Sequence, residues 1–137
     1  MNQALNIYTD GGARGNPGPA AIGVVIKDQS GKALHQFGRP IGKATNNLAE
    51  YQAVISALKY LITNKIKPRS INFFLDSTLV VNQLNGLWKI KDVNLRQKVI
   101  QIRQLKDSFS IPIKYTAIPR QQNSQADALL NQALDQA

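Results

Sequence analysis

The chain has 137 residues, of which 43% are hydrophobic, and this length and apolar fraction suit one globular domain with its own core. It contains no cysteine, which excludes disulfides, thiolate metal sites and a cysteine nucleophile. Seventeen Lys and Arg against eight Asp and Glu give a net charge of +9, which indicates a polyanionic partner, most often nucleic acid. The alternative explanation of the positive charge, which stays open here, is a basic protein whose charge only keeps it soluble.

The chain carries no recognisable targeting or membrane segment. Its first six residues lack both a basic region and an apolar stretch, so no signal peptide is expected. No apolar run approaches the roughly 18 residues that cross a bilayer. We therefore expect a cytoplasmic protein without membrane association, and nothing in the sequence requires more than a monomer.

The first third of the chain predicts an antiparallel meander. Residues 4–10 are typical of a strand that ends at Gly11-Gly12, and a loop rich in Gly and Pro follows up to Pro19. Residues 20–27 are typical of a buried strand. A turn at 28–31 then brings the chain back as a third strand over 32–39.

The rest of the chain alternates helices and strands. Apolar residues recur at helical spacing from Leu48 onward, and Asn47 and Glu50 have the spacing of a capping box. An α/β fold with a mixed sheet and helices on its faces follows from this order, in a single domain over residues 1–137. The later elements expected are a helix from Leu48, a strand over 70–76, a short helix over 77–84, a long helix over 92–109, a strand over 111–117 and a helix over 124–137.

Four of the eight acids fall at the ends of expected elements. Asp10 and Asp76 close the first and fourth strands, whereas Glu50 and Asp127 lie in the first turns of two helices. Sites in α/β sheets gather at such positions, so the four carboxylates are expected to meet at one edge of the sheet. Each also has a structural alternative as a turn residue, a cap or a partner of the helix dipole.

A cluster of carboxylates has a physical consequence. Two carboxylates about 4 Å apart repel by a few kcal/mol at an effective dielectric constant near 20, unless they share protons or bind cations. Oxygen ligands without His or Cys suit Mg²⁺ or Mn²⁺. A basic chain with such a pocket indicates phosphodiester chemistry.

These residues lie in motifs that resemble the type 1 ribonucleases H. The motifs are YTDGGARGNPGP at 8–19, TNNLAE at 45–50, LDS at 75–77 with VVN at 80–82, and NSQAD at 123–127. The resemblance implies a five-stranded mixed sheet, three antiparallel strands first and then two parallel ones, flanked by helices. It also implies a metal-dependent endonuclease that cuts the RNA strand of RNA/DNA hybrids and leaves 5′-phosphate and 3′-hydroxyl ends.

The resemblance further implies two Mg²⁺, with Mn²⁺ as a possible substitute, held by the four carboxylates. One metal would activate the attacking water and the other would stabilise the leaving 3′-oxygen. Asp10 is the expected shared ligand. Asp76 is expected on the nucleophile side, with Glu50 and Asp127 on the other.

Substrate contacts are expected around the same edge, since 2′-hydroxyls distinguish RNA from DNA. Backbone groups of Gly11, Gly12 and Ala13 and the side chains of Asn16, Asn46 and Asn47 would face the minor groove. Thr45 matches the family's threonine that binds a DNA phosphate. The remaining expected contacts are Thr78, Trp88, Lys89 and Asn123.

Three departures from the family pattern stand out. The histidine that many members carry before the last aspartate is absent; His35, predicted to be structural, is the only histidine, and Arg120 is expected to contact the scissile phosphate or assist product departure. An arginine cannot act as a general base at neutral pH. Thr78 stands in place of a frequent glutamine.

The third departure is the connection over 87–93, which is too short for a long basic protrusion. Within it, Trp88 packs either against the DNA backbone or in the core. A weaker grip on DNA makes cleavage of double-stranded RNA a hypothesis. The competing interpretations are a non-catalytic nucleic-acid-binding module and another nuclease of the superfamily, such as a junction resolvase or a transposase-like domain.

Overall fold

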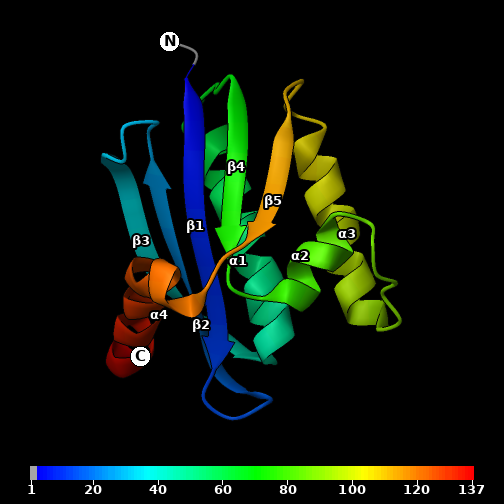
Figure 1. The fold of residues 1–137 in the computed structure, drawn as a ribbon. Helices are drawn as coiled ribbons and strands as arrows, with labels where there is room; N and C mark the ends of the chain where they lie inside the picture. The colour runs from blue at the N-terminus through cyan, green and yellow to red at the C-terminus, as the bar shows by residue number, and fades with distance from the viewer. Residues whose placement is uncertain (1–2) are drawn as a thin grey trace.

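The computed structural model describes residues 3–137 and contains one five-stranded sheet with the strand order β3-β2-β1-β4-β5. The first three strands pair antiparallel, and β1 with β4 and β4 with β5 pair parallel. The predicted α/β fold with a mixed sheet is therefore confirmed (Figure 1). The strands are β1 (Ala4–Ala13), β2 (Gly18–Lys27), β3 (Ala33–Ala44), β4 (Ser70–Leu75) and β5 (Ile113–Ala117).

Helices cover both faces of the sheet. In Figure 1, α4 lies in front of β2 and β3, whereas α1 lies behind the sheet with α3 packed beside it. The short α2 follows β4 and lies near β5. The helices are α1 (Asn46–Thr63), α2 (Thr78–Leu84), α3 (Val93–Lys106) and α4 (Ser124–Gln136), and a 3-10 turn, η1 (Arg120–Asn123), precedes α4. None of the helices within residues 3–137 has the length and apolar character of a membrane span.

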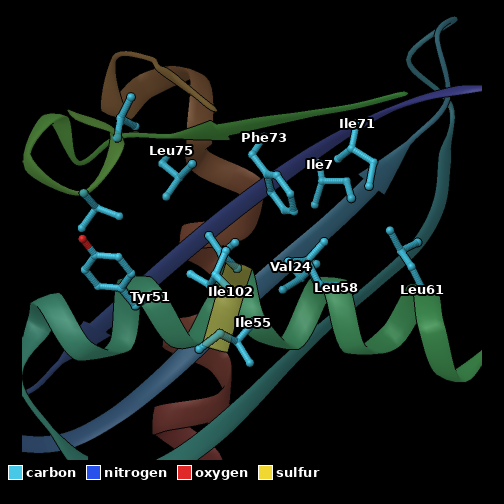
Figure 2. Packing of buried hydrophobic residues seen from close by; sticks show 14 of the residues in the cluster. Ile7, Val24, Tyr51, Ile55, Leu58, Leu61, Ile71, Phe73, Leu75 and Ile102 are labelled. Atoms are coloured by element: carbon cyan, nitrogen blue, oxygen red, sulfur yellow. The ribbon is translucent and has the colours of Figure 1, made fainter. Parts of the chain in front are cut away.

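The main core lies between the sheet and α1. Figure 2 shows Tyr51, Ile55 and Leu58 of α1 in one packed cluster with Ile7 and Phe73 of the sheet. All five side chains are fully buried. The helical spacing that predicted α1 thus corresponds to its contact with the sheet, and burial of this apolar area is the main source of stability.

The strands of the meander are longer than the sequence predicts. The pairs Gly12↔Ala21 and Ala13↔Ala20 continue the β1–β2 ladder through the glycines that were expected to begin the loop. The loop therefore spans only residues 14–17, and Asp10 lies inside β1 rather than at its end. Glycine and proline indicate turns only on average, and here pairing with a neighbouring strand overrides that preference.

The helix caps also differ from the prediction. Thr45, not Asn47, caps α1, because its hydroxyl accepts a hydrogen bond of 3.2 Å from the Leu48 amide. Glu50 is consequently the fifth residue of α1 and no capping-box partner. Ser77 caps α2 in the same way, so Asp76 does not. The long helix ends at Lys106 instead of 109, and β5 begins at Ile113 instead of 111.

His35 has a packing role, as predicted. Its ring stacks on Tyr60 of α1 with ring centres 4.2 Å apart, and it also contacts Phe37 on the same strand. This row of aromatic rings fastens β3 to α1.

Candidate active site

Three carboxylates meet where β1 and β4 part. The parallel pairing of these strands ends at Tyr8↔Phe74. Asp10 lies two residues further along β1, and Asp76 directly follows β4. Because β4 turns away at this point, β1 loses a neighbour and the two aspartates face the space that opens.

Glu50 reaches the same place because α1 lies unusually close to β1. A Cβ at Gly11 would overlap the backbone carbonyl of Ala49, so only glycine permits this approach. The Gly11 amide donates a hydrogen bond of 3.1 Å to Glu50 Oε1. The side chain is thus anchored to the strand rather than to its own helix.

The resulting cluster consists of Asp10, Glu50 and Asp76. One carboxylate oxygen from each lies within 4.8 Å of those of the other two. Asp10 and Glu50 are only 5% and 6% exposed, and Glu50 Oε2 is buried without a hydrogen-bond partner among the described residues. A buried oxygen without a partner and an all-oxygen donor set fit a hard divalent cation.

Burial and mutual repulsion perturb these acids. Burial is the main reason that the pKa of Asp10 rises to about 7, and the charges of Asp76 and Asp127 add to it. Burial likewise raises the pKa of Glu50 well above its usual value. It also raises the pKa of Asp76, whereas the Arg120 guanidinium opposes that increase. Without a cation, the cluster therefore holds protons at neutral pH.

A pH dependence of stability follows. Native Asp10 keeps its proton up to a pH of about 7, whereas the unfolded chain releases it near 3.8. Between these values the unfolded state binds fewer protons, so the free energy of unfolding of the metal-free protein should fall as the pH rises. Urea unfolding in EDTA at several pH values from about 4.5 to 8 measures this. Stability that rises across this window would contradict the burial of protonated carboxylates, and saturating Mg²⁺ should flatten the slope.

Asp127 lies at the edge of the cluster rather than within it. It belongs to the first turn of α4 and lines the same cleft, but it is not among the three acids that share one centre. Its position depends on two paired glycines, Gly23 and Gly38, because a Cβ on either would overlap the backbone of α4 at Ala126 or Leu129. Glycine on both strands therefore lets α4 lie against the sheet.

The carboxylates form the floor of an open cleft of about 370 Å³. Asn46 Oδ1 accepts a hydrogen bond of 2.8 Å from the Ala13 amide, and Asn16 Oδ1 accepts one of 2.9 Å from the Asn46 amide. These bonds fix the loop after β1 against the start of α1, so the rim of the cleft is preformed. The predicted residues that line it are Asp10, Gly11, Gly12, Ala13, Asn46, Asn47, Glu50, Asp76, Arg120 and Asp127.

Other predicted residues do not line this cleft. Thr78, Trp88 and Lys89 are exposed on α2 and the connection that follows it, and Trp88, at 49% exposure, is not part of the core. Thr45 caps α1 beside the cleft. Asn123 is 1% exposed and its amide donates a hydrogen bond of 2.9 Å to the Thr9 carbonyl. Its side chain therefore holds the start of α4 to β1, and the substrate contact expected of it stays a prediction.

Two arginines flank the carboxylates. Arg120 is 86% exposed and its Nε lies 3.9 Å from Asp76 Oδ2. Arg14, which the sequence did not single out, lines the cleft and pairs with Asp135 of α4 at 2.6 Å. Its position within the Gly-rich motif at 8–19 could have indicated that Arg14 lies near the site. A polar cleft with buried acids and flanking guanidinium groups suits an anionic substrate held at a cation centre.

Comparison with known proteins agrees with this geometry. A family model described as reverse transcriptase-like matches residues 8–133. The ribonuclease H of Verminephrobacter eiseniae is 34% identical over 163 residues, covering 100% of this chain and 94% of the relative. The crystal structure of LC11-RNase H1, isolated from compost, in complex with an RNA/DNA hybrid superimposes with a TM-score of 0.92 and 43% identity over 96% of this chain and 97% of that one. The chain belongs to the type 1 ribonuclease H family.

Other members of the family are longer. The ribonuclease HI of Halobacterium salinarum is 43% identical over 133 residues, which cover 97% of this chain but 65% of that relative. The matching proteins of Mycobacterium bovis and Mycobacterium tuberculosis are longer still, and this chain spans 35% of their length. Residues of the motifs at 8–19, 45–50, 75–77 and 123–127 line the cleft described above.

Proposed function

We propose that residues 1–137 form a single ribonuclease H domain that hydrolyses the RNA strand of RNA/DNA hybrids. The observation that carries this is the meeting of Asp10, Glu50 and Asp76 at the floor of a polar cleft in a chain with a net charge of +9. The solved complex of LC11-RNase H1 with an RNA/DNA hybrid supports it. A monomer is the proposed working form.

The residues proposed to hold two Mg²⁺, or Mn²⁺ in their place, are Asp10, Glu50, Asp76 and Asp127. The buried oxygen of Glu50 and the all-oxygen donor set fit such ions. When bound, they would supply Lewis-acid stabilisation of charge on the phosphoryl group and easier ionisation of water. The proposed products carry 5′-phosphate and 3′-hydroxyl ends.

The chain's own residues would orient the substrate. Asn46 and Asn16 use their oxygens within the protein, so their amide NH₂ groups are left to donate to 2′-hydroxyls. Asn47 and the backbone of Gly11 to Ala13 line the same rim. Because DNA lacks the 2′-hydroxyl, these contacts would select the RNA strand for cutting.

Cleavage of end-labelled substrates tests the function. RNA/DNA hybrid, double-stranded RNA and double-stranded DNA would be incubated with Mg²⁺, Mn²⁺ or EDTA, with Asp76→Asn as the control variant. We expect metal-dependent cuts in the RNA strand of the hybrid that are lost in the variant. Tight binding of the hybrid without cleavage in either metal would instead favour the binding module.

Double-stranded RNA is proposed as a second, weaker substrate. The short connection with Trp88 and Lys89 is exposed and offers few groups that depend on a DNA strand. Slow cuts in double-stranded RNA are expected in the same assay. Their absence at enzyme concentrations that exhaust the hybrid would exclude this activity.

Arg120 is expected to assist the reaction without being essential. Arg120→Ala should lower the single-turnover rate by about tenfold, because the guanidinium beside Asp76 would no longer neutralise charge at the phosphate. Gln121→Ala, at the exposed neighbouring position, is the matched control. An unchanged rate for Arg120→Ala would show that this arginine is a surface residue with no role in the reaction.

A further inference from the structure

A second polar pocket lies across α1 from the carboxylate cleft. It has a volume of about 440 Å³ and lies between β3, α1 and α3. Leu48, Gln52 and Ser56 line it, whereas Asn47 and Glu50 line the cleft. At 3.6 residues per turn these two sets face opposite sides of the helix. Both pockets therefore border the first turns of α1.

This pocket collects positive charge without a counterion. Arg39 and Lys43 of β3 and Lys98 of α3 line it, and no carboxylate does. Within residues 3–137, the only basic residues that form an ion pair are Arg14 and Arg120, so none of the pocket's cations is paired with a carboxylate. Like charges around one pocket repel, so the arrangement favours an anion.

The cationic groups are held in place by neighbouring side chains. Lys98 Nζ donates a hydrogen bond of 3.0 Å to Gln52 Oε1, and Gln52 Nε2 donates one of 3.3 Å to the Ser56 hydroxyl. The Arg39 guanidinium lies 4.9 Å from the centre of the Phe37 ring, which packs against the main core. Groups ordered before binding lose less conformational entropy when a ligand arrives.

The location indicates which anion the pocket takes. The two pockets are separated by the width of α1, roughly 10 Å. The two backbones of a duplex face each other across a minor groove that is about 6 Å wide in B-form DNA and wider in A-form helices. A duplex whose cut strand lies in the cleft therefore brings its other backbone around the start of α1 towards the basic pocket.

We propose that this basic pocket is a phosphate site for the strand that is not cut, formed by Arg39, Lys43, Gln52, Ser56 and Lys98. The site lies beyond Thr45, where the resemblance already implies one DNA phosphate, and so extends the contact along the DNA strand. This inference rests on the proposed hybrid substrate. A free phosphate or a nucleotide shares the chemistry and is distinguished in the test.

The test compares two double variants with the same change in charge. Arg39→Gln/Lys98→Gln removes the pocket's cations, and Arg103→Gln/Lys106→Gln removes two exposed cations near the end of α3. Binding of a labelled hybrid in EDTA is followed by fluorescence anisotropy over a range of salt concentrations. The pocket variant should bind about tenfold more weakly at ~0.1 M salt, with a log–log salt slope shallower by about 1–2. The control should stay close to wild type.

Two further readouts define the site. The deficit should vanish with a hybrid whose DNA strand carries neutral methylphosphonates, and kcat at saturating hybrid should stay within about twofold of wild type while KM rises. Equal binding by both double variants would overturn the proposal. The proposal would also be overturned if wild type bound a nucleoside monophosphate tightly, the pocket variant lost this binding, and both proteins bound the hybrid equally well, since the pocket would then be a nucleotide site. Binding is measured in EDTA, where no cleavage occurs. A wild-type protein that binds hybrid through this pocket but never cuts it would therefore refute the proposed nuclease function and leave the proposed phosphate site standing.

Discussion

Asp10→Asn should abolish cleavage while making the metal-free protein more stable. The substitution removes a carboxylate from the centre of the cluster, and the loss of cation-dependent stabilisation should lower the rate by at least about a thousandfold. It also removes repulsion between Asp10, Asp76 and Asp127. The free energy of unfolding in EDTA should rise by on the order of 1–2 kcal/mol near pH 8.

Two measurements separate this outcome from a structural role of Asp10. Urea unfolding in EDTA should show the gain near pH 8, and the gain should shrink towards about pH 5, where native Asp10 is already protonated. Asp107→Asn, at an exposed acid just beyond α3, is a control of equal charge change. A large loss of stability in Asp10→Asn would instead mean that the carboxylate supports the fold.

Gly23→Ala should damage activity far more than its size suggests. The new Cβ would overlap the Ala126 carbonyl, and because the obstacle is backbone, α4 must move away from the sheet. Asp127 is the next residue, so it would be displaced from the cleft. We expect about 1–3 kcal/mol of destabilisation and a loss of cleavage of about a hundredfold, the effect typical of a displacement near 1 Å.

Gly12→Ala is the matched control for stability. A Cβ at Gly12 would lie 3.7 Å from Leu130 Cδ1, which is an ordinary contact, so its free energy of unfolding should stay close to that of wild type. Wild-type cleavage by a folded Gly23→Ala protein would show that the position of α4, and hence Asp127, is not critical.

The sequence alone determined the kinds of element and the kind of chemistry. Helical spacing placed Tyr51, Ile55 and Leu58 on one face of a helix, and all three are buried as predicted. The scarcity of acids and the motifs around them singled out Asp10, Glu50 and Asp76, which the structure brings together. These signals are local, because periodicity and residue type act within a few turns of chain.

The tertiary structure decided how those residues are used. Glu50 has the spacing of a capping-box partner in its own helix, which was the structural alternative to its role in the cluster, but the close approach of α1 at Gly11 turns it to the Gly11 amide of β1. The motif around Asn123 does not predict the hydrogen bond by which its side chain holds the start of α4 to the Thr9 carbonyl of β1. The contacts that override these local preferences join residues far apart in sequence.

The basic pocket illustrates the same limit. Arg39 and Lys98 belong to different elements, and no spacing in the chain relates them. They meet only because β3 and α3 both pack beside α1. Local sequence patterns record what each segment prefers alone, whereas sheet pairing and backbone contact at glycines determine which distant side chains share a site.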